Sequence, residues 1–136
     1  MSRSNLVFRR EDNWRPLSYR LELPAEILEF RSCRLDILLL EMSVAGCGLW
    51  AGFKIRIERP ITLFVGGFAP IKARTAWSDS GFAELIFDQH LHLSVVQHMA
   101  RQAAASRPRA STLGVPSAAH AEFASLSQEL GKPLSI

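Results

Sequence analysis

The residues of this sequence that are best placed to do chemistry are a serine and a glycine in a short turn. Ser43 and Gly46 stand between two apolar runs, residues 35–40 and residues 47–50. Small and polar residues in close order between apolar runs are typical of a tight turn between two buried strands. Gly46 allows backbone angles that a residue with a Cβ resists, and Ser43 places a hydroxyl near the rim of whatever the strands enclose. We therefore expect this turn to form one half of a ligand site.

The other half of the site is expected among the arginines near the N-terminus. Residues 1–20 hold five arginines, no lysine and two acidic residues, whereas residues 21–136 hold eleven basic and eleven acidic residues. The net charge of +3 therefore comes from this arm, which indicates a localised anionic partner. The planar fork of an arginine can bind a phosphate, or the Hoogsteen edge of guanine, through two hydrogen bonds. The alternative is a solvated, disordered basic tail.

Length and composition limit the class of protein. A chain of 136 residues with 48% hydrophobic and 21% charged residues is long enough for one globular domain with a modest core. No apolar run approaches the roughly 20 residues that a membrane-spanning helix requires, and the N-terminus lacks the apolar segment of a signal peptide. We therefore expect a cytoplasmic protein without membrane insertion, in which Cys33 and Cys47 are reduced and buried.

Alternating apolar and polar residues predict six strands. The first strand contains Pro24, which hints at an edge position. On the fifth strand, Trp77 is expected to share one face with Ile71, Ala73 and Thr75. The alternation at residues 53–57 either continues the third strand or forms a separate short piece. The expected strands cover residues 21–27, 33–40, 47–50, 61–65, 71–77 and 82–87.

After the last expected strand, the spacing of the apolar residues becomes that of a helix. It predicts a helix over residues 93–104, a linker over 105–116 and a second, weaker helix over 118–130. Phe123, Leu126 and Leu130 lie on one side of the second helix, which either docks on the body of the protein or binds a partner. Six short strands followed by a helix point to a small closed antiparallel barrel, because closure removes unpaired strand edges.

Three segments of the chain resemble the PilZ domain family. Residues 40–46, Leu-Glu-Met-Ser-Val-Ala-Gly, are similar to the family's D/N-x-S-x-x-G motif. Residues 73–87 look like its final hairpin, and residues 20–25 are similar to its first strand, which follows an arginine motif. The resemblance covers residues 15–103 and implies an all-β fold, a six-stranded antiparallel β-barrel with a C-terminal helix. It divides the chain into a basic N-terminal arm (1–19), a PilZ-like barrel plus helix (20–104), and a linker with a weak C-terminal helix (105–136).

The resemblance also implies a ligand, the bacterial second messenger cyclic di-GMP. Family members bind it through an R-x-x-x-R pair before the first strand and through the D/N-x-S-x-x-G turn. In this sequence Arg15 and Arg20 stand five residues apart instead of four, and Glu41 occupies the position of the Asp or Asn. The ligand-binding residues expected on this basis are Arg10, Arg15, Arg20, Glu41, Ser43 and Gly46, to which Trp77 is added as a stacking platform for a base.

Two functions follow from these observations. The first is a receptor for cyclic di-GMP whose arginine arm becomes ordered on binding and thereby switches a downstream protein partner. The second, motivated by the two departures from the motif, is a degenerate PilZ-like adaptor that binds protein and no nucleotide. Trp77 then belongs to the core or the barrel rim. We expect no enzyme activity, no cofactor and no DNA partner, and we interpret His90 and His92 as a solvated turn instead of a metal site.

Overall fold

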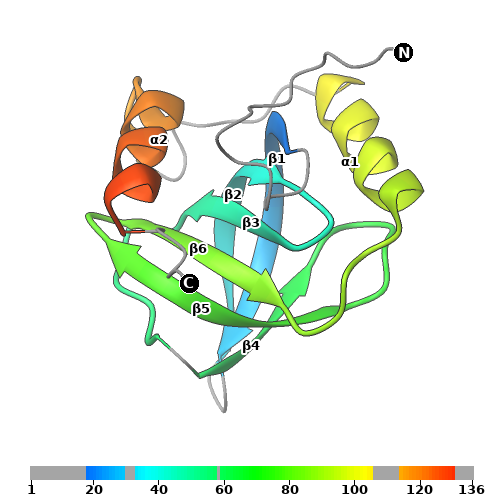
Figure 1. Ribbon diagram of the computed structural model, residues 1–136, viewed down its shortest axis with the longest axis horizontal. Helices are drawn as coiled ribbons and strands as arrows, with labels where there is room; N and C mark the ends of the chain where they lie inside the picture. Colours follow the sequence, from blue (N-terminus) through cyan, green and yellow to red (C-terminus); the bar gives the residue numbers. More distant parts are fainter. Residues whose placement is uncertain (1–17, 30–32, 58, 106–113, 131–136) are drawn as a thin grey trace.

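The strands of the chain close into a barrel, as the computed structural model in Figure 1 shows. The structure describes residues 18–29, 33–57, 59–105 and 114–130. Neighbouring strands pair antiparallel in the order β1-β2-β3-β6-β5-β4, and β4 pairs back with β1 to complete the ring. The predicted six-stranded antiparallel barrel is therefore confirmed by the strand pairing of the chain itself.

The expected strands and helices are all present, and their ends lie within two residues of the predicted positions. Neither of the two described helices is long and apolar enough to cross a membrane. The strands are β1 (Tyr19–Glu29), β2 (Arg34–Met42), β3 (Gly46–Trp50), β4 (Pro60–Phe64), β5 (Ile71–Asp79) and β6 (Phe82–Phe87), and the helices are α1 (Leu93–Ala105) and α2 (Ala119–Leu130).

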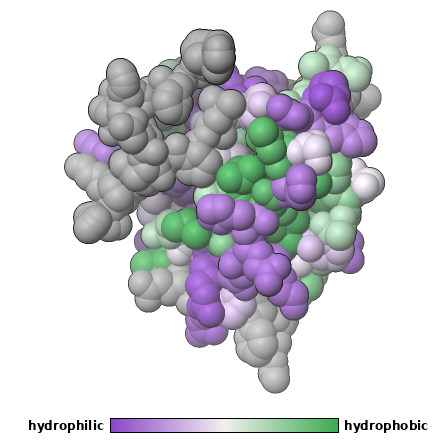
Figure 2. Space-filling model, turned by 45° about the vertical axis from the view of Figure 1, so that its right-hand side comes forward, coloured by the Kyte–Doolittle hydropathy of each residue, from purple (hydrophilic) through white to green (hydrophobic). Residues whose placement is uncertain are grey.

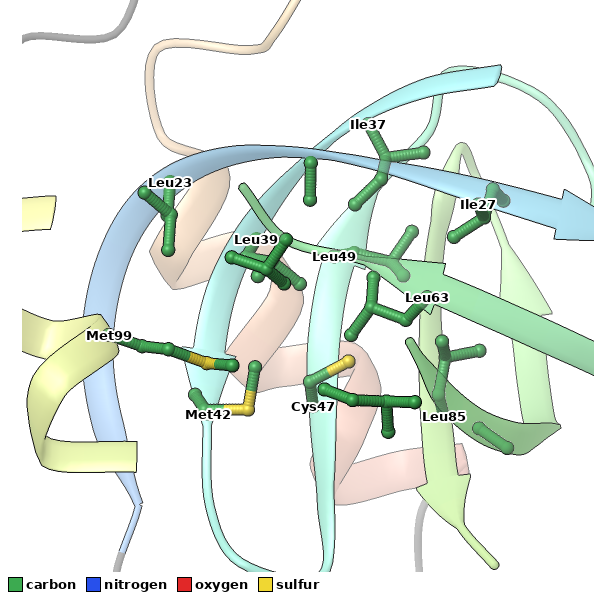
Figure 3. Packing of buried hydrophobic residues seen from close by; sticks show 14 of the residues in the cluster. Leu23, Ile27, Ile37, Leu39, Met42, Cys47, Leu49, Leu63, Leu85 and Met99 are labelled. Atoms are coloured by element: carbon green, nitrogen blue, oxygen red, sulfur yellow. The ribbon is translucent and has the colours of Figure 1, made fainter. Parts of the chain in front are cut away.

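Apolar side chains from all six strands fill the barrel, and α1 covers part of this core. Val96, Met99 and Ala103 are the buried residues of α1, and they belong to the same apolar cluster as the strand interior. Their spacing of three and four residues places one apolar stripe of the helix against the barrel. Figure 3 shows Met99 reaching from α1 toward Met42 of β2. The helix that follows the last strand is thus an integral part of the core.

Strand β1 shows how a proline fits into a closed barrel. Pro24 pairs with Leu38 of β2, whereas the pairing of β1 with β4 begins only at Glu26. A proline has no N–H to donate to a neighbouring strand, so it fits a stretch that is paired on one side only. β1 is therefore not an edge strand as Pro24 suggested, and the proline marks a local gap in the pairing.

The residues after β3 form a loop instead of a strand. β3 ends at Trp50, and residues 51–57 contain no strand. Ile55 is nevertheless buried in the main core, and its backbone N–H donates to Ser78 Oγ over 2.9 Å, while Ile57 is exposed. The alternation at residues 53–57 therefore does not mark a strand. Ile55 is buried within an irregular segment, and Ile57 is exposed.

A shift of register in β5 turns Trp77 out of the barrel. Ile71 and Ala73 belong to the interior cluster, but the pairing of β5 with β6 slips between Thr75 and Trp77. Such an irregularity reverses the direction in which the following side chains point. Trp77 accordingly packs in a second apolar cluster on the outside of the barrel, together with Phe82. The prediction that Trp77 shares a face with Ile71 and Ala73 is wrong for this reason.

Helix α2 lies on this second cluster, as its position beside the barrel in Figure 1 shows. Its buried residues, Ala119, Phe123 and Ser127, are spaced four apart and form a single narrow stripe. Leu126 is partly buried at the margin of the cluster, and Leu130 is 43% exposed. Of the two alternatives for this helix, the structure shows the docked one.

Candidate ligand-binding face

The turn between β2 and β3 is held together by the side chain of Ser43. Its Oγ accepts hydrogen bonds from the N–H groups of Ala45 and Gly46 and donates to the Gly46 carbonyl, each over 3.2 Å. The Ser43 N–H also donates to the Gly46 carbonyl over 2.9 Å. A hydroxyl has one proton and two lone pairs, so the turn uses its full hydrogen-bonding capacity. A ligand contact at Ser43 must therefore replace one of these bonds.

Gly46 is required by the barrel itself. It is the first residue of β3 and pairs with Ile86 of β6. A Cβ on residue 46 would collide with the backbone carbonyl oxygen of Leu85. The backbone of a paired strand cannot move aside as a flexible side chain can. The match of Gly46 to the family motif thus has a structural reason, whether or not a ligand also uses the space.

Arg20 and Glu41 lie directly opposite each other on β1 and β2. Arg20 is exposed and Glu41 is half-buried. Opposite charges at directly paired positions attract each other across neighbouring strands. Glu41 lies two residues before Ser43, so this pairing brings one predicted cation to the predicted turn. The register of the barrel therefore unites Arg20, Glu41 and Ser43 at one end of the β1–β2 ladder.

A continuous line of paired residues runs outward from this point across five strands. Glu41 pairs with Gly48 of β3, Gly48 pairs with Glu84 of β6, and Glu84 pairs with Trp77 of β5. We call this line the outer row; its members are Arg20, Glu41, Gly48, Glu84 and Trp77. The outer row joins two predicted ligand residues on β1 and β2 to a third on β5.

Helix α2 covers the middle and the far end of the outer row. Phe123 lies directly over Gly48, so that a Cβ on residue 48 would collide with its ring. The same ring stacks on Trp77, with 5.6 Å between ring centroids and 22° between ring planes. Trp77 Nε1 donates to Glu84 Oε1 over 2.7 Å, and Ser127 Oγ donates to the same oxygen over 3.4 Å. The Glu84 carboxylate therefore accepts hydrogen bonds both from Trp77 of β5 and from Ser127 of α2.

The N-terminal turn of α2 also contacts β1, beside Arg20. His120 Nε2 lies 2.8 Å from the Leu21 carbonyl oxygen, which can only accept, so Nε2 carries the hydrogen. His120 Nδ1 lies 3.8 Å from a carboxylate oxygen of Glu22. α2 thus spans the outer row from the neighbourhood of Arg20 to Trp77.

The predicted ligand residues therefore fall into three groups. Arg20, Glu41, Ser43 and Gly46 lie close together on β1, β2 and the following turn. Trp77 lies on the same outer row but is 6% exposed, because α2 covers it. Its role in binding a base stays a prediction, and contact with a base requires Phe123 to leave. Arg10 and Arg15 lie outside the described residues.

A shallow hollow of about 330 Å³ adjoins the turn on its other side. Ile86, which pairs with Gly46 and with Arg74, is 55% exposed at this place. Figure 2 shows the surface as a whole from the side of α1: hydrophobic residues gather near the middle of this view and hydrophilic residues border them. The hollow adds a cation, Arg74, that sequence reasoning did not connect with the turn. It is lined by Arg74, Thr75, Ala76, Ile86, Phe87 and Asp88.

Cys47, on β3, carries an inert thiol. Burial raises its pKa well above the ordinary value, and the carboxylates of Glu84 and Glu41 raise it further. The prediction that Cys47 is buried is correct, whereas Cys33 is exposed. Within the part of the chain that the structure describes, no three His, Cys, Asp or Glu side chains are grouped to hold a metal ion. His90 and His92 are both exposed.

Sequence reasoning missed three residues of this face. Gly48 stands within the run of residues 47–50, and its role depends on a helix that lies far along the chain. Glu84 is the single charged residue of the β6 sequence, which by itself names no partner. Phe123 was placed on an apolar helix face, yet nothing in its surroundings in the sequence named the strand beneath it. Only the pairing of distant strands brings these residues together.

Comparison with known proteins yields likenesses to solved structures. No protein-family model matches the sequence, and no curated protein matches it. Among solved structures, the chain is similar to the PilZ domain of CeSA from a cellulose-synthesizing bacterium. The TM-score is 0.48 and the identity 14%, over 64% of this chain and 94% of that one. The closed six-stranded barrel itself rests on the strand order described above.

Proposed function

We propose that this PilZ-like chain is a receptor for cyclic di-GMP that acts by binding and carries out no covalent chemistry. The observation that supports this proposal is the direct pairing of Arg20 with Glu41 beside the Ser43 turn. The three residues match, in place and in type or charge, the binding positions that the family resemblance implies.

Each residue has a chemical task in this proposal. The Arg20 guanidinium binds a phosphate or the O6 and N7 acceptors of guanine. The Glu41 carboxylate accepts hydrogen bonds from the N–H groups on the opposite edge of guanine. Ser43 exchanges one of its turn bonds for a ligand bond. Arg10 and Arg15, from the N-terminal arm, supply further positive charge for the two phosphates.

The signal is a change in the surface that the protein offers to a downstream partner. Once Arg10 and Arg15 contact the ligand, the arm lies against the barrel and forms a surface that the ligand-free chain lacks. The ligand can shift this equilibrium only by its difference in affinity for the two states. The salt dependence of such binding is strong, because its cations meet phosphates at the protein surface.

A second function, a protein adaptor without a nucleotide, is favoured by two contacts. The hydrogen bonds of the Ser43 hydroxyl are all made within the turn, and α2 covers Trp77. In that case the exposed parts of α2, including Leu130, offer the contact surface. The departures at Glu41 and in the arginine spacing then have no consequence for function.

Calorimetric titration of the full chain with cyclic di-GMP at low salt separates the two functions. The receptor proposal predicts binding at tens of micromolar protein and a loss of at least about tenfold in affinity in Arg20→Ala, because a charge-assisted hydrogen bond is removed. Arg101→Ala is the matched control, since Arg101 is exposed on α1, outside the outer row. Absence of heat with the wild type rejects the receptor and leaves the adaptor.

A further inference from the structure

The contact between α2 and the barrel has the chemistry of a bound nucleobase. The Phe123 ring fills a slot whose floor is Gly48 and whose wall is the stacked ring of Trp77. Beside the ring, the Ser127 hydroxyl donates to the carboxylate of Glu84. A flat aromatic ring and an adjacent hydrogen-bond donor are the two features by which proteins recognise a base.

The slot exists because residue 48 lacks a side chain. Any Cβ at this position would occupy the space of the ring, whereas the neighbouring outward residues of the cluster, Leu38 and Phe82, are large. The glycine thus leaves a ring-sized gap between large side chains. Its floor is backbone of β3, which is paired with strands on both sides and therefore rigid.

Glu84 makes the slot selective. An ionised carboxylate only accepts hydrogen bonds, and Trp77 Nε1 already occupies one position on Oε1 at 2.7 Å. The donor supplied by α2 is the Ser127 hydroxyl, at the longer distance of 3.4 Å. Guanine carries two adjacent donors, N1–H and the N2 amino group, on one edge. Adenine presents an acceptor, N1, next to its amino group, which a carboxylate repels.

We propose that the slot formed by Gly48, Trp77 and Glu84 is a site for a guanine base, which Phe123 and Ser127 of α2 occupy in the ligand-free chain. The inference rests on the proposed function, because the outer row connects this slot to Arg20 and Glu41. One base of cyclic di-GMP stacks on Trp77 and donates to Glu84, while Arg20 binds the phosphates. α2 is therefore an internal competitor of the ligand.

The contacts of α2 suit an element that can be displaced. Its buried stripe holds one large side chain, Phe123, between Ala119 and Ser127. A base that stacks on Trp77 replaces the ring contact that Phe123 gives up, since bases stack favourably on aromatic rings. Docking of α2 and binding of the ligand then oppose each other. A change that strengthens the docking of α2 lowers the affinity for the ligand by the same factor.

The test compares the full-length wild type with Phe123→Ala, using cyclic di-GMP and cyclic di-AMP as probes. Removal of the competing ring is expected to raise the affinity for cyclic di-GMP by about tenfold, a typical coupling between sites. Adding Glu84→Gln to Phe123→Ala is expected to abolish the gain in affinity and to reduce the preference over cyclic di-AMP. Leu126→Ala, at the margin of the contact, is the matched control for loss of apolar area from α2.

Hydrogen exchange gives a second readout. Ligands ordinarily slow the exchange of amides in the elements they touch, whereas here cyclic di-GMP is expected to speed exchange in residues 119–130 of the wild type. Slower exchange of these amides in the presence of the ligand would overturn the proposal that ligand and helix compete. Because this measurement uses the wild type, it also tests the competition where Phe123→Ala lowers the stability of the whole chain.

The outcomes separate the slot from the receptor function. Binding by the wild type without a gain in Phe123→Ala overturns the slot and leaves the receptor standing. Guanine-selective binding by Phe123→Ala alone supports the slot and shows that the intact chain is not a receptor. If neither protein binds, both proposals fail.

Discussion

The ring of Phe123 lies over Gly48 at a point where residue 48 can carry no side chain. These residues stand 75 positions apart in the sequence, on α2 and β3. Their contact ties the C-terminal helix to the outer face of the barrel, where it covers Trp77 and shares Glu84 with it.

Gly48→Ala is expected to undock α2 without disturbing the barrel interior. The added methyl group enters the space of the Phe123 ring, and such overpacking costs about 1–3 kcal/mol. Gly66→Ala is the matched control, because no atom lies within 4 Å of a Cβ at residue 66. Limited proteolysis between residues 105 and 130 should become faster in Gly48→Ala only. Equal cleavage of both variants would contradict the contact.

Gly46→Ala is expected to destabilise the barrel itself. Its Cβ meets the Leu85 carbonyl oxygen, a backbone atom of a paired strand, so relief requires β3 and β6 to separate locally. We expect a loss of more than about 2 kcal/mol in the free energy of unfolding, measured by denaturant titration. A stable Gly46→Ala protein that loses only ligand affinity would instead show that the glycine serves the ligand alone.

The thiol of Cys47 should make stability depend on alkaline pH. Burial raises its pKa in the folded state, whereas the pKa of an unfolded cysteine is about 8.5. Below that pH both states hold the proton. Above it only the unfolded chain releases the proton, so the free energy of unfolding falls by up to about 1.4 kcal/mol per pH unit.

Cys47→Ala should remove this slope, and exposed Cys33 should react with a thiol reagent in the folded protein while Cys47 does not. Chemical denaturation at several pH values, with labelling followed by mass spectrometry, measures both effects. Rapid labelling of Cys47 in the folded chain would show that the β3 region opens more readily than its burial indicates.

Glu41→Gln is expected to lower the affinity for cyclic di-GMP about tenfold if the carboxylate accepts hydrogen bonds from guanine. A neutral amide is a weaker hydrogen-bond acceptor and presents a donor on one side. Asp36→Asn is the control, since Asp36 is an exposed carboxylate of the same strand, at the end away from the turn. The comparison is made by calorimetry at one salt concentration. Equal affinities of Glu41→Gln and wild type would remove Glu41 from the site.

Local patterns of the sequence predicted the parts of this fold that depend on near neighbours. The alternation at residues 21–27 predicted β1 because one face of that strand meets the core. The change of period after residue 91 predicted α1 for the same reason. The same rule failed at residues 53–57, where a buried Ile55 in a loop imitates a strand, and at Trp77, where a slip in the pairing of β5 with β6 reverses the side chain.

By itself, the sequence determined a six-stranded barrel with two helices, a serine–glycine turn and a basic arm, because spacing and residue type carry that information. Tertiary structure alone decided that Arg20 faces Glu41 and that Phe123 rests on Gly48. Strand register and helix docking depend on pairs of residues far apart in the chain. No local pattern encodes such a pair, because the sequence around one partner carries no information about the other.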